Sequence, residues 1–157
     1  MQIRLIWAGK TKPVEINKLI ERYLERLSRY VRVAIHEIKA EKISKNISPS
    51  LIKNKEAERI LKFIDNTGKL LVWDQRGKQL NSLEFAFLLK NLEAQGIPVL
   101  WNVIGGPLGL APHLIRKANH VLSLSIMTFP HDLARLLVVE QLYRAYSILH
   151  GSPYHRE

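Results

Sequence analysis

Cysteine is absent from this chain of 157 residues. Its absence excludes disulfides, thiolate nucleophiles and zinc or iron–sulfur centres bound through cysteine. A protein that needs no oxidised thiols fits a reducing compartment. We therefore expect a cytoplasmic location.

Long hydrophobic runs are also lacking. The most apolar window, 97–115, contains three prolines and three glycines. A membrane-spanning helix needs about 20 consecutive, mostly apolar residues and tolerates such breaks poorly. The apolar run at the start of the chain is too short for a signal peptide. We expect a protein that neither crosses nor is anchored to a membrane.

Several motifs that carry chemistry are missing. No Gly-Lys-Ser/Thr follows the glycine-rich segment, so it is not a phosphate loop, and its spacing is not that of a dinucleotide site. There is no Gly-x-Ser-x-Gly elbow for a serine hydrolase. The six histidines are scattered without a His-Glu-x-x-His pattern, so we expect no metal site.

Positive charge, by contrast, is abundant and unevenly placed. The formal net charge is +10, and residues 1–62 hold 15 Lys and Arg against 7 Asp and Glu, whereas residues 63–157 hold 9 against 7. A basic surface attracts polyanions, of which nucleic acid is the commonest in the cytoplasm. The distribution favours binding to nucleic acid or the ribosome over a basic surface without function.

Hydrophobic periodicity predicts an alternation of strands and helices. The expected strands are 2–9, 31–38, 68–74, 97–106 and 120–127, and the expected helices are 13–30, about 50–65, 82–95, 112–119 and 131–150. Ser48 or Ser50 is expected to cap the second helix and Ser82 the third, and 75–80 is expected to turn. This order predicts an α/β fold, a single domain over 1–157, with a mostly parallel sheet flanked by helices.

Ligands bind beyond the carboxyl ends of the strands in such sheets. Here those ends are Trp73-Asp74, the glycine-rich "VIGGPLGL" at 103–110, and "SLSIMTFPH" at 123–131. Glycines let a ligand approach the backbone closely, although a tight structural turn explains the glycine-rich stretch at 103–110 equally well. In the stretch 123–131, Met127 and Phe129 are more typical of a core than of a pocket.

The end of the chain carries a third group of candidates. Glu140 and Arg144 are four residues apart on the last helix, which favours a surface ion pair over an arginine aimed at a phosphate or a developing negative charge. The chain then closes with "GSPYHRE", which places Tyr154, His155 and Arg156 where ordinary solvating residues are the norm.

Taken in order, several stretches resemble one family. They are "IRLIWAGK", a basic loop near residue 42, "VIGGPLGL", "LSLSIMTFPHDLARLLVVEQLYRAYSI" and "SPYHRE". Together they resemble the RlmH (YbeA-type) branch of the SPOUT methyltransferases over essentially the whole chain. The combination is specific, although each piece alone is weak.

The resemblance implies a SPOUT-type fold with a deep trefoil knot in the C-terminal part, and a homodimer. It also implies transfer of a methyl group from S-adenosylmethionine to N3 of a pseudouridine. The target lies in an inter-subunit stem-loop of 23S rRNA, and the assembled ribosome is the substrate.

The same resemblance assigns site residues. The S-adenosylmethionine site would comprise Trp73, Gly105, Leu124, Ser125, Ile126, Met127, Thr128 and Phe129. The residues acting near the substrate would be Arg144, Tyr154, His155 and Arg156, with His131 as a further candidate. The tail of one subunit is expected to reach the cofactor pocket of its partner. Trp73 and Leu108 depart from the family pattern, which has a smaller aliphatic and a polar residue there.

These residues suggest roles but leave alternatives open. His155 is placed to accept the proton that N3 must lose, Arg144 or Arg156 to stabilise the resulting charge, and Tyr154 to stack on the base or hydrogen-bond to it. Two other functions fit the charge equally well: a ribosome-binding module without enzymatic activity, and a methyltransferase acting on another rRNA base or on tRNA.

Overall fold

The computed structural model describes residues 1–154, so His155 and Arg156 lie outside the described residues. Strands and helices alternate along the chain, as predicted. In order they are β1 (Gln2–Ala8), α1 (Val14–Leu27), β2 (Arg32–Ile38), α2 (Pro49–Leu61), β3 (Lys69–Gln79), α3 (Ser82–Ala94), β4 (Val99–Ile104), α4 (Pro112–Lys117), β5 (His120–Ser123) and α5 (His131–Leu149).

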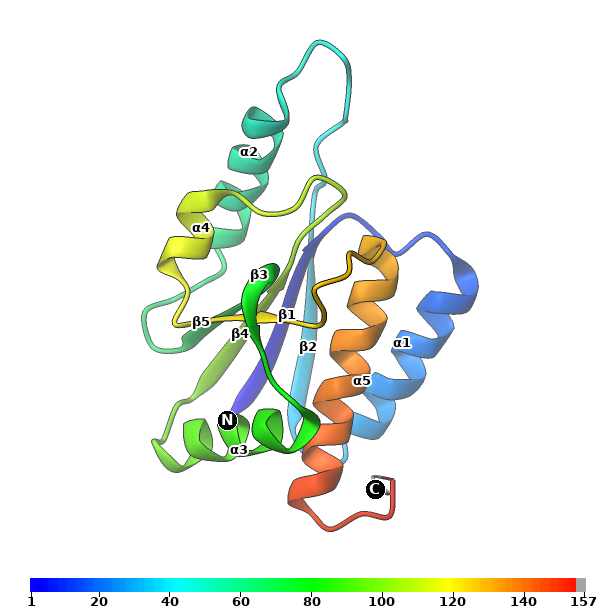
Figure 1. The fold of residues 1–157 in the computed structure, drawn as a ribbon, viewed down its shortest axis with the longest axis vertical. Helices are drawn as coiled ribbons and strands as arrows, with labels where there is room; N and C mark the ends of the chain where they lie inside the picture. The colour runs from blue at the N-terminus through cyan, green and yellow to red at the C-terminus, as the bar shows by residue number, and fades with distance from the viewer. Residues whose placement is uncertain (155–157) are drawn as a thin grey trace.

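The strands form one five-stranded sheet in the order β2-β1-β4-β3-β5. Every neighbouring pair is parallel, which confirms the predicted α/β fold with a mostly parallel sheet. Helices α1, α3 and α5 cover one face and α2 and α4 the other, so the sheet is the middle of three layers (Figure 1). The carboxyl ends of the central strands therefore meet at one edge, where a ligand can bind.

Side-chain alternation along β1 shows how the sequence builds both layers. Ile3, Leu5 and Trp7 are buried in the core beneath α1, α3 and α5. Ile6 and Ala8 point to the opposite face, under α2 and α4. A strand buried on both faces is nearly continuous in apolar residues, as the sequence of β1 is.

The helix caps agree only in part with the sequence prediction. Ser48 caps α2, accepting a hydrogen bond from the Leu51 N–H at 3.2 Å. The prediction of Ser82 as the cap of α3 was wrong, because Asn81 accepts from the Glu84 N–H at 2.8 Å and Glu84 bonds back in a capping box. The Ser82 hydroxyl instead donates to Gln141 at 3.1 Å.

Strand β3 differs most from the expectation. The turn predicted at 75–80 was wrong, because β3 continues to Gln79 and pairs with β5 twice, through 71–73 and again through 78–79. Strand β5 is shorter than predicted, ending at Ser123. Its predicted second half instead forms an ordered bend, in which the Ser123 hydroxyl donates to the Ser125 carbonyl at 2.7 Å.

The second half of β3 crosses directly over β5 (Figure 1). At the crossing, a Cβ on Gly77 would lie 2.5 Å from the carbonyl carbon of Leu122, so no larger residue fits without displacing backbone. One segment of chain thus lies tightly against another that is more than forty residues away in sequence. This crossing is compatible with the knotted path that the resemblance implies, and the knot itself stays a prediction.

Within residues 1–154, no helix combines the length and apolar character required to span a bilayer.

We expect Gly77→Ala to lower the free energy of unfolding by roughly 2–3 kcal/mol, since the added methyl overlaps backbone atoms that have no room to move. Gly106→Ala is the matched control, because its Cβ would meet the nearest atom at an ordinary 3.6 Å. Urea denaturation of both variants measures the difference. Equal midpoints for Gly77→Ala and the wild type would show that the crossing is loose.

Candidate active site

A cavity of about 590 Å³ opens at the carboxyl edge of the sheet. Three segments line it: 73–76 within β3, 104–110 at and after the end of β4, and 123–131 from the end of β5 to the start of α5. These are the three segments that the sequence singled out as strand ends. Ile126, which the sequence assigned to the site, is not among the lining residues. The volume lies within the usual range for a small-molecule site.

The glycine-rich segment forms a tight loop rather than a phosphate cradle. The Gly109 N–H donates to the Gly106 carbonyl at 2.9 Å, and Gly109 has a φ of +79°, which favours glycine. A Cβ on Gly105 would lie 3.1 Å from Gly109, which is tighter than about nine in ten real contacts. Glycine at 105 thus fits this turn without displacing its neighbours.

The segment after β5 contributes an exposed, mostly apolar rim. Ile126 and Met127 are 83% and 72% exposed and Phe129 is 39% exposed. The interpretation of Met127 and Phe129 as core residues was therefore wrong, and both line the cavity. The Thr128 N–H has no hydrogen-bond partner among residues 1–154 and Thr128 lines the cavity, so this donor is available to a ligand.

Trp73 and Asp74, in the middle of β3, form one wall of the cavity. The Trp73 indole N–H donates to Asn102 at 3.3 Å, and its ring packs edge-on against Phe85 at 5.5 Å, so these contacts hold the large ring against the sheet. Asp74 is held by Arg76 at 2.8 Å, and this hydrogen bond keeps the pKa of the carboxyl below its usual value. A fixed negative charge therefore lines the cavity.

A buried arginine that the sequence left unassigned supports the remaining wall. Arg135 is fully buried and donates to the Ala8 carbonyl at 2.6 Å, to the Thr11 hydroxyl at 3.1 Å and to Asp132 at 3.1 Å. It fixes the first turn of α5, where His131 lines the cavity. The sequence signal that could have identified Arg135 is its position within an apolar run of the helix, because a charge buried there needs buried partners.

Arg144 and Tyr154 meet elsewhere, at the other end of α5. Arg144 donates to Glu140 at 3.0 Å, which confirms the predicted ion pair, and its guanidinium lies 4.9 Å from the centre of the Tyr154 ring. The Tyr154 hydroxyl donates to the same Glu140 at 3.0 Å and lies 3.2 Å from that of Tyr23. The sequence paired Glu140 with Arg144 but missed the contact of Glu140 with Tyr154, and it missed Tyr23.

The contacts of Arg144 and Tyr154 determine the protonation states of both side chains. Its hydrogen bond to Glu140 raises the pKa of the Arg144 guanidinium. Burial, together with the hydrogen bond to Tyr23, raises the pKa of the Tyr154 phenol. Both side chains are therefore protonated at neutral pH and act as donors.

The two groups of candidate residues lie far apart within one chain. His131 and Arg144 are thirteen positions apart on α5, which corresponds to about 20 Å along the helix axis. The chain leaves α5 at the end remote from the cavity, where the described part of the C-terminus lies (Figure 1). One copy of the chain therefore does not bring Arg144 and Tyr154 to the cavity.

Comparison with known proteins defines the class. The family model described as "Predicted SPOUT methyltransferase" matches residues 1–155. The chain belongs to this family of methyltransferases, as its sequence motifs predicted. Its α/β fold, with the cavity at the carboxyl edge of the parallel sheet, agrees with that assignment.

Two relatives in this family are similar to the chain over nearly its whole length. The chain is 52% identical to a protein of Syntrophobacter fumaroxidans named "Ribosomal RNA large subunit methyltransferase H", covering 99% of this chain and 100% of the relative. A protein of the same name from Clostridium botulinum is 41% identical, also over 99% and 100% of the two chains.

Solved structures support the fold. A methylase family protein of Haemophilus influenzae superposes with a TM-score of 0.58 at 14% identity, covering 99% of this chain and 70% of that one. A methyltransferase of Bordetella pertussis gives 0.57 at 12% identity, covering 92% and 96%.

Histidine burial predicts a pH dependence of stability. Burial lowers the pKa of His36, His120 and His131, whereas in the unfolded chain they titrate near pH 6.5. The unfolded state therefore binds more protons below that pH, and stability falls as pH drops. We expect a lower free energy of unfolding at pH 5.5 than at pH 7.5, and a smaller drop in His120→Gln. An identical drop in that variant would contradict the assignment.

Proposed function

We propose that this protein methylates large-subunit ribosomal RNA, using S-adenosylmethionine as the methyl donor and N3 of a pseudouridine in 23S rRNA as the acceptor. The observation that carries the proposal is the cavity at the sheet edge, built from the strand ends whose motifs match the family. Two relatives named ribosomal RNA large subunit methyltransferase H, which match 99% of this chain, support the substrate class.

The cavity residues fit S-adenosylmethionine. The Gly105 backbone lines the cavity, and the free N–H group of Thr128 suits the polar edge of an adenine. The Asp74 carboxylate, paired with Arg76, is a further polar group in the lining. When bound, this cofactor supplies a methyl group activated by a sulfonium centre. We assign its binding to Trp73, Gly105 and the segment Leu124–Phe129.

The acceptor requires a proton to be removed, because N3 of a uracil-type base is a weak acid. Arg144 and Tyr154 are donors at neutral pH, which suits the stabilisation of negative charge on the base and its hydrogen bonding or stacking. We therefore assign the proton acceptor to His155, with Arg156 as a second cation. From the resemblance we also infer that the substrate is the assembled ribosome. The protein would then act in the cytoplasm.

We further propose that the active form is a homodimer, in which each 157-residue chain acts as a single domain and its C-terminal part is knotted. The separation of about 20 Å between the two residue groups supports this arrangement. A second copy lying antiparallel along α5 would bring its Arg144 and tail to the cavity. The exposed Ile126, Met127 and Phe129 provide an apolar surface for it to cover.

The first experiment is methyl transfer from labelled S-adenosylmethionine to ribosomes that lack the modification, with free large subunits and tRNA in parallel. We expect label in 23S rRNA, and a fall in cofactor affinity of tenfold or more in Gly105→Ala, since its methyl enters the turn. Gly106→Ala, with its ordinary contacts, should lose less.

Label in tRNA would overturn the substrate and retain the enzyme class. No label, with folded protein that shows no cofactor binding by calorimetry, would favour a ribosome-binding module instead.

Mixed dimers test the shared site. Gly105→Trp disrupts the glycine-rich turn that lines the cavity and Arg144→Ala removes a donor, so each variant alone should lose at least 100-fold in turnover. Co-expressed with separate affinity tags, the two should recover about a quarter to half of wild-type activity, because one mixed site has both intact halves. A mixture no more active than either variant would place both halves in one chain.

A further inference from the structure

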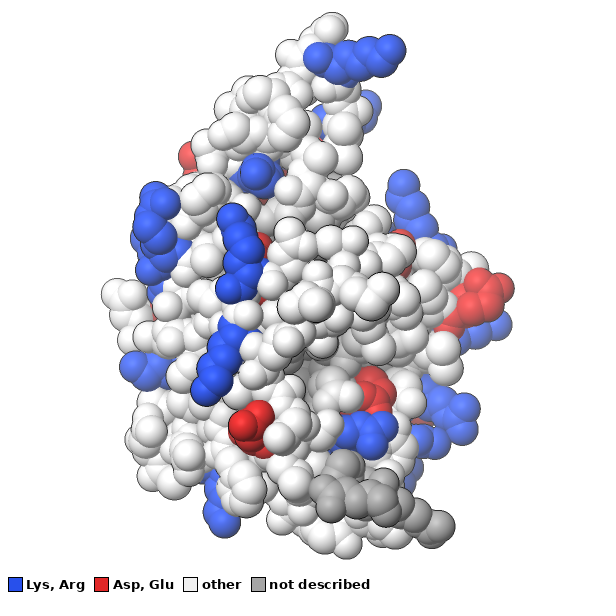
Figure 2. Space-filling model, viewed as in Figure 1, with Lys and Arg blue, Asp and Glu red and all other residues white. Residues whose placement is uncertain are grey.

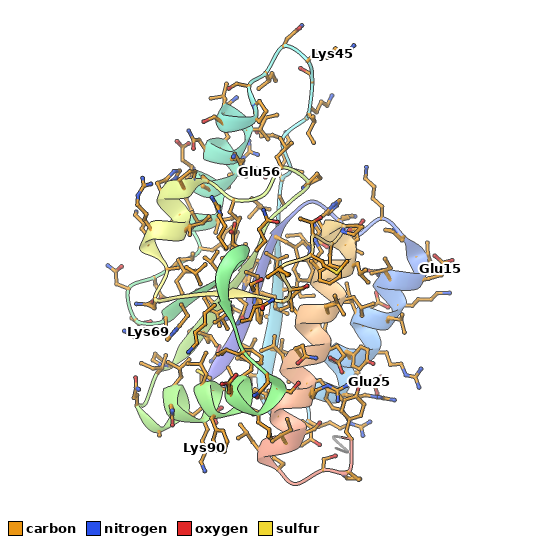
Figure 3. The ribbon with its side chains drawn as sticks, in the orientation of Figure 1. Glu15, Glu25, Lys45, Glu56, Lys69 and Lys90 are labelled. Carbon is orange, nitrogen blue, oxygen red and sulfur yellow. The ribbon has the colours of Figure 1, made fainter. Side chains whose placement is uncertain are left out.

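Residues 39–59 form an arm whose outer part, the loop after β2, projects from the body of the molecule, whereas Ile52 and Ala57 in α2 are buried. It comprises the loop after β2 and most of α2, with Lys45 near its tip (Figures 1 and 3). Lys39, Lys42 and Lys45 are exposed, and none has an ion-pair partner among residues 1–154. Lys and Arg side chains stand out on the α2 and α4 side of the face shown in Figure 2, where few acidic side chains reach the surface.

The acidic groups of the arm are largely engaged inside it. Glu56 is only 8% exposed, and it accepts a hydrogen bond from the Glu41 N–H at 3.0 Å. The Glu41 carboxylate pairs with Arg59 and lies 4.0 Å from Lys55, and the bond from Arg59 lowers the pKa of Glu41. Arg59 also donates to the Lys39 carbonyl at 2.6 Å. These contacts hold the loop against α2 and leave its lysines facing outward.

The base of the arm adjoins the candidate active site. Lys53 lines the cavity. The second carboxylate oxygen of Glu56 would lie 3.6 Å from a Cβ placed on Gly106, in the glycine-rich turn. A molecule held by the arm is therefore held beside the cavity, and the direction of the arm is fixed relative to it.

We propose that the arm binds the phosphate backbone of the substrate RNA through Lys42 and Lys45, and that Glu41 positions it. This inference rests on the proposed function and identifies the part of a small chain that holds its large substrate. Residues 39–59 contain no aromatic side chain and no histidine. Stacking on bases is therefore excluded there, and flexible point charges suit phosphate contacts that fix position without reading sequence.

The first test is the double variant Lys42→Gln/Lys45→Gln. Binding to ribosomes and to a protein-free 23S rRNA fragment is measured by filter retention across a series of salt concentrations. We expect affinity to fall about tenfold at moderate salt and the slope of log affinity against log salt to become shallower by about 1–2, because phosphate contacts release counterions. Cofactor affinity should be unchanged.

The matched control is Lys69→Gln/Lys90→Gln, which removes the same charge from the opposite part of the molecule (Figure 3). It should change the slope by less than half as much. Equal effects of the two double variants would overturn the proposal in favour of overall net charge. Weaker binding to ribosomes with unchanged binding to the RNA fragment would overturn it in favour of a ribosomal protein as the partner.

A second pair separates positioning from charge. Glu41→Gln and Glu58→Gln each remove one negative charge from the arm, but Glu58 is exposed and has no recorded ion pair within residues 1–154. Electrostatics alone predicts tighter RNA binding in both. We expect tighter binding in Glu58→Gln and at least threefold weaker binding in Glu41→Gln, and tighter binding in both would refute the positioning role.

The test of RNA binding is independent of the test of methyl transfer. If the wild type binds RNA through the arm but transfers no methyl group, the proposed function is refuted and the proposal of RNA binding by the arm is retained. If methyl transfer occurs and the lysine variants keep the wild-type salt slope, only the proposal of RNA binding by the arm is refuted.

Discussion

The buried guanidinium of Arg135 is the constraint on which the site depends. A buried cation needs hydrogen-bond partners, and the two terminal nitrogens of Arg135 find them in the Ala8 carbonyl, the Thr11 hydroxyl and Asp132. The Arg135 Nε has no partner within residues 1–154, and the Trp7 ring lies 5.3 Å from the guanidinium. The three partners come from the end of β1, the following loop and α5 itself. The start of α5, and with it the cavity wall before His131, can therefore occupy one position.

Helix α5 carries that constraint to the other end of the molecule. The same helix presents Glu140, which gathers Arg144 and Tyr154 far from the cavity. Because the two groups sit on one rigid element, bending of a single chain cannot join them. The association of two copies that we propose would join them, and the proposed RNA-binding arm at 39–59 would then extend from the edge of each cavity.

Most of the fold and part of the site could be predicted from the sequence. The alternation of strands and helices, the parallel sheet and the three strand ends that line the cavity follow from periodicity and from the glycine turn. The path of β3 could not be predicted, since "QRGKQ" has the composition of a turn and becomes a strand only where β5 offers it a partner. The exposure of Met127 and Phe129 likewise depends on where the bend after Ser123 directs them.

What the sequence determined by itself is local: which segments are strands and helices, where glycine permits a tight turn, and which motifs define the family. The tertiary structure decided what depends on contacts distant in sequence. Gly77 matters because Leu122 crosses it, Arg135 because Ala8 and Thr11 accept its hydrogen bonds, and Tyr154 because Tyr23 and Glu140 hold it. Such partners are chosen by packing of the whole chain, and no pattern of neighbouring residues specifies them.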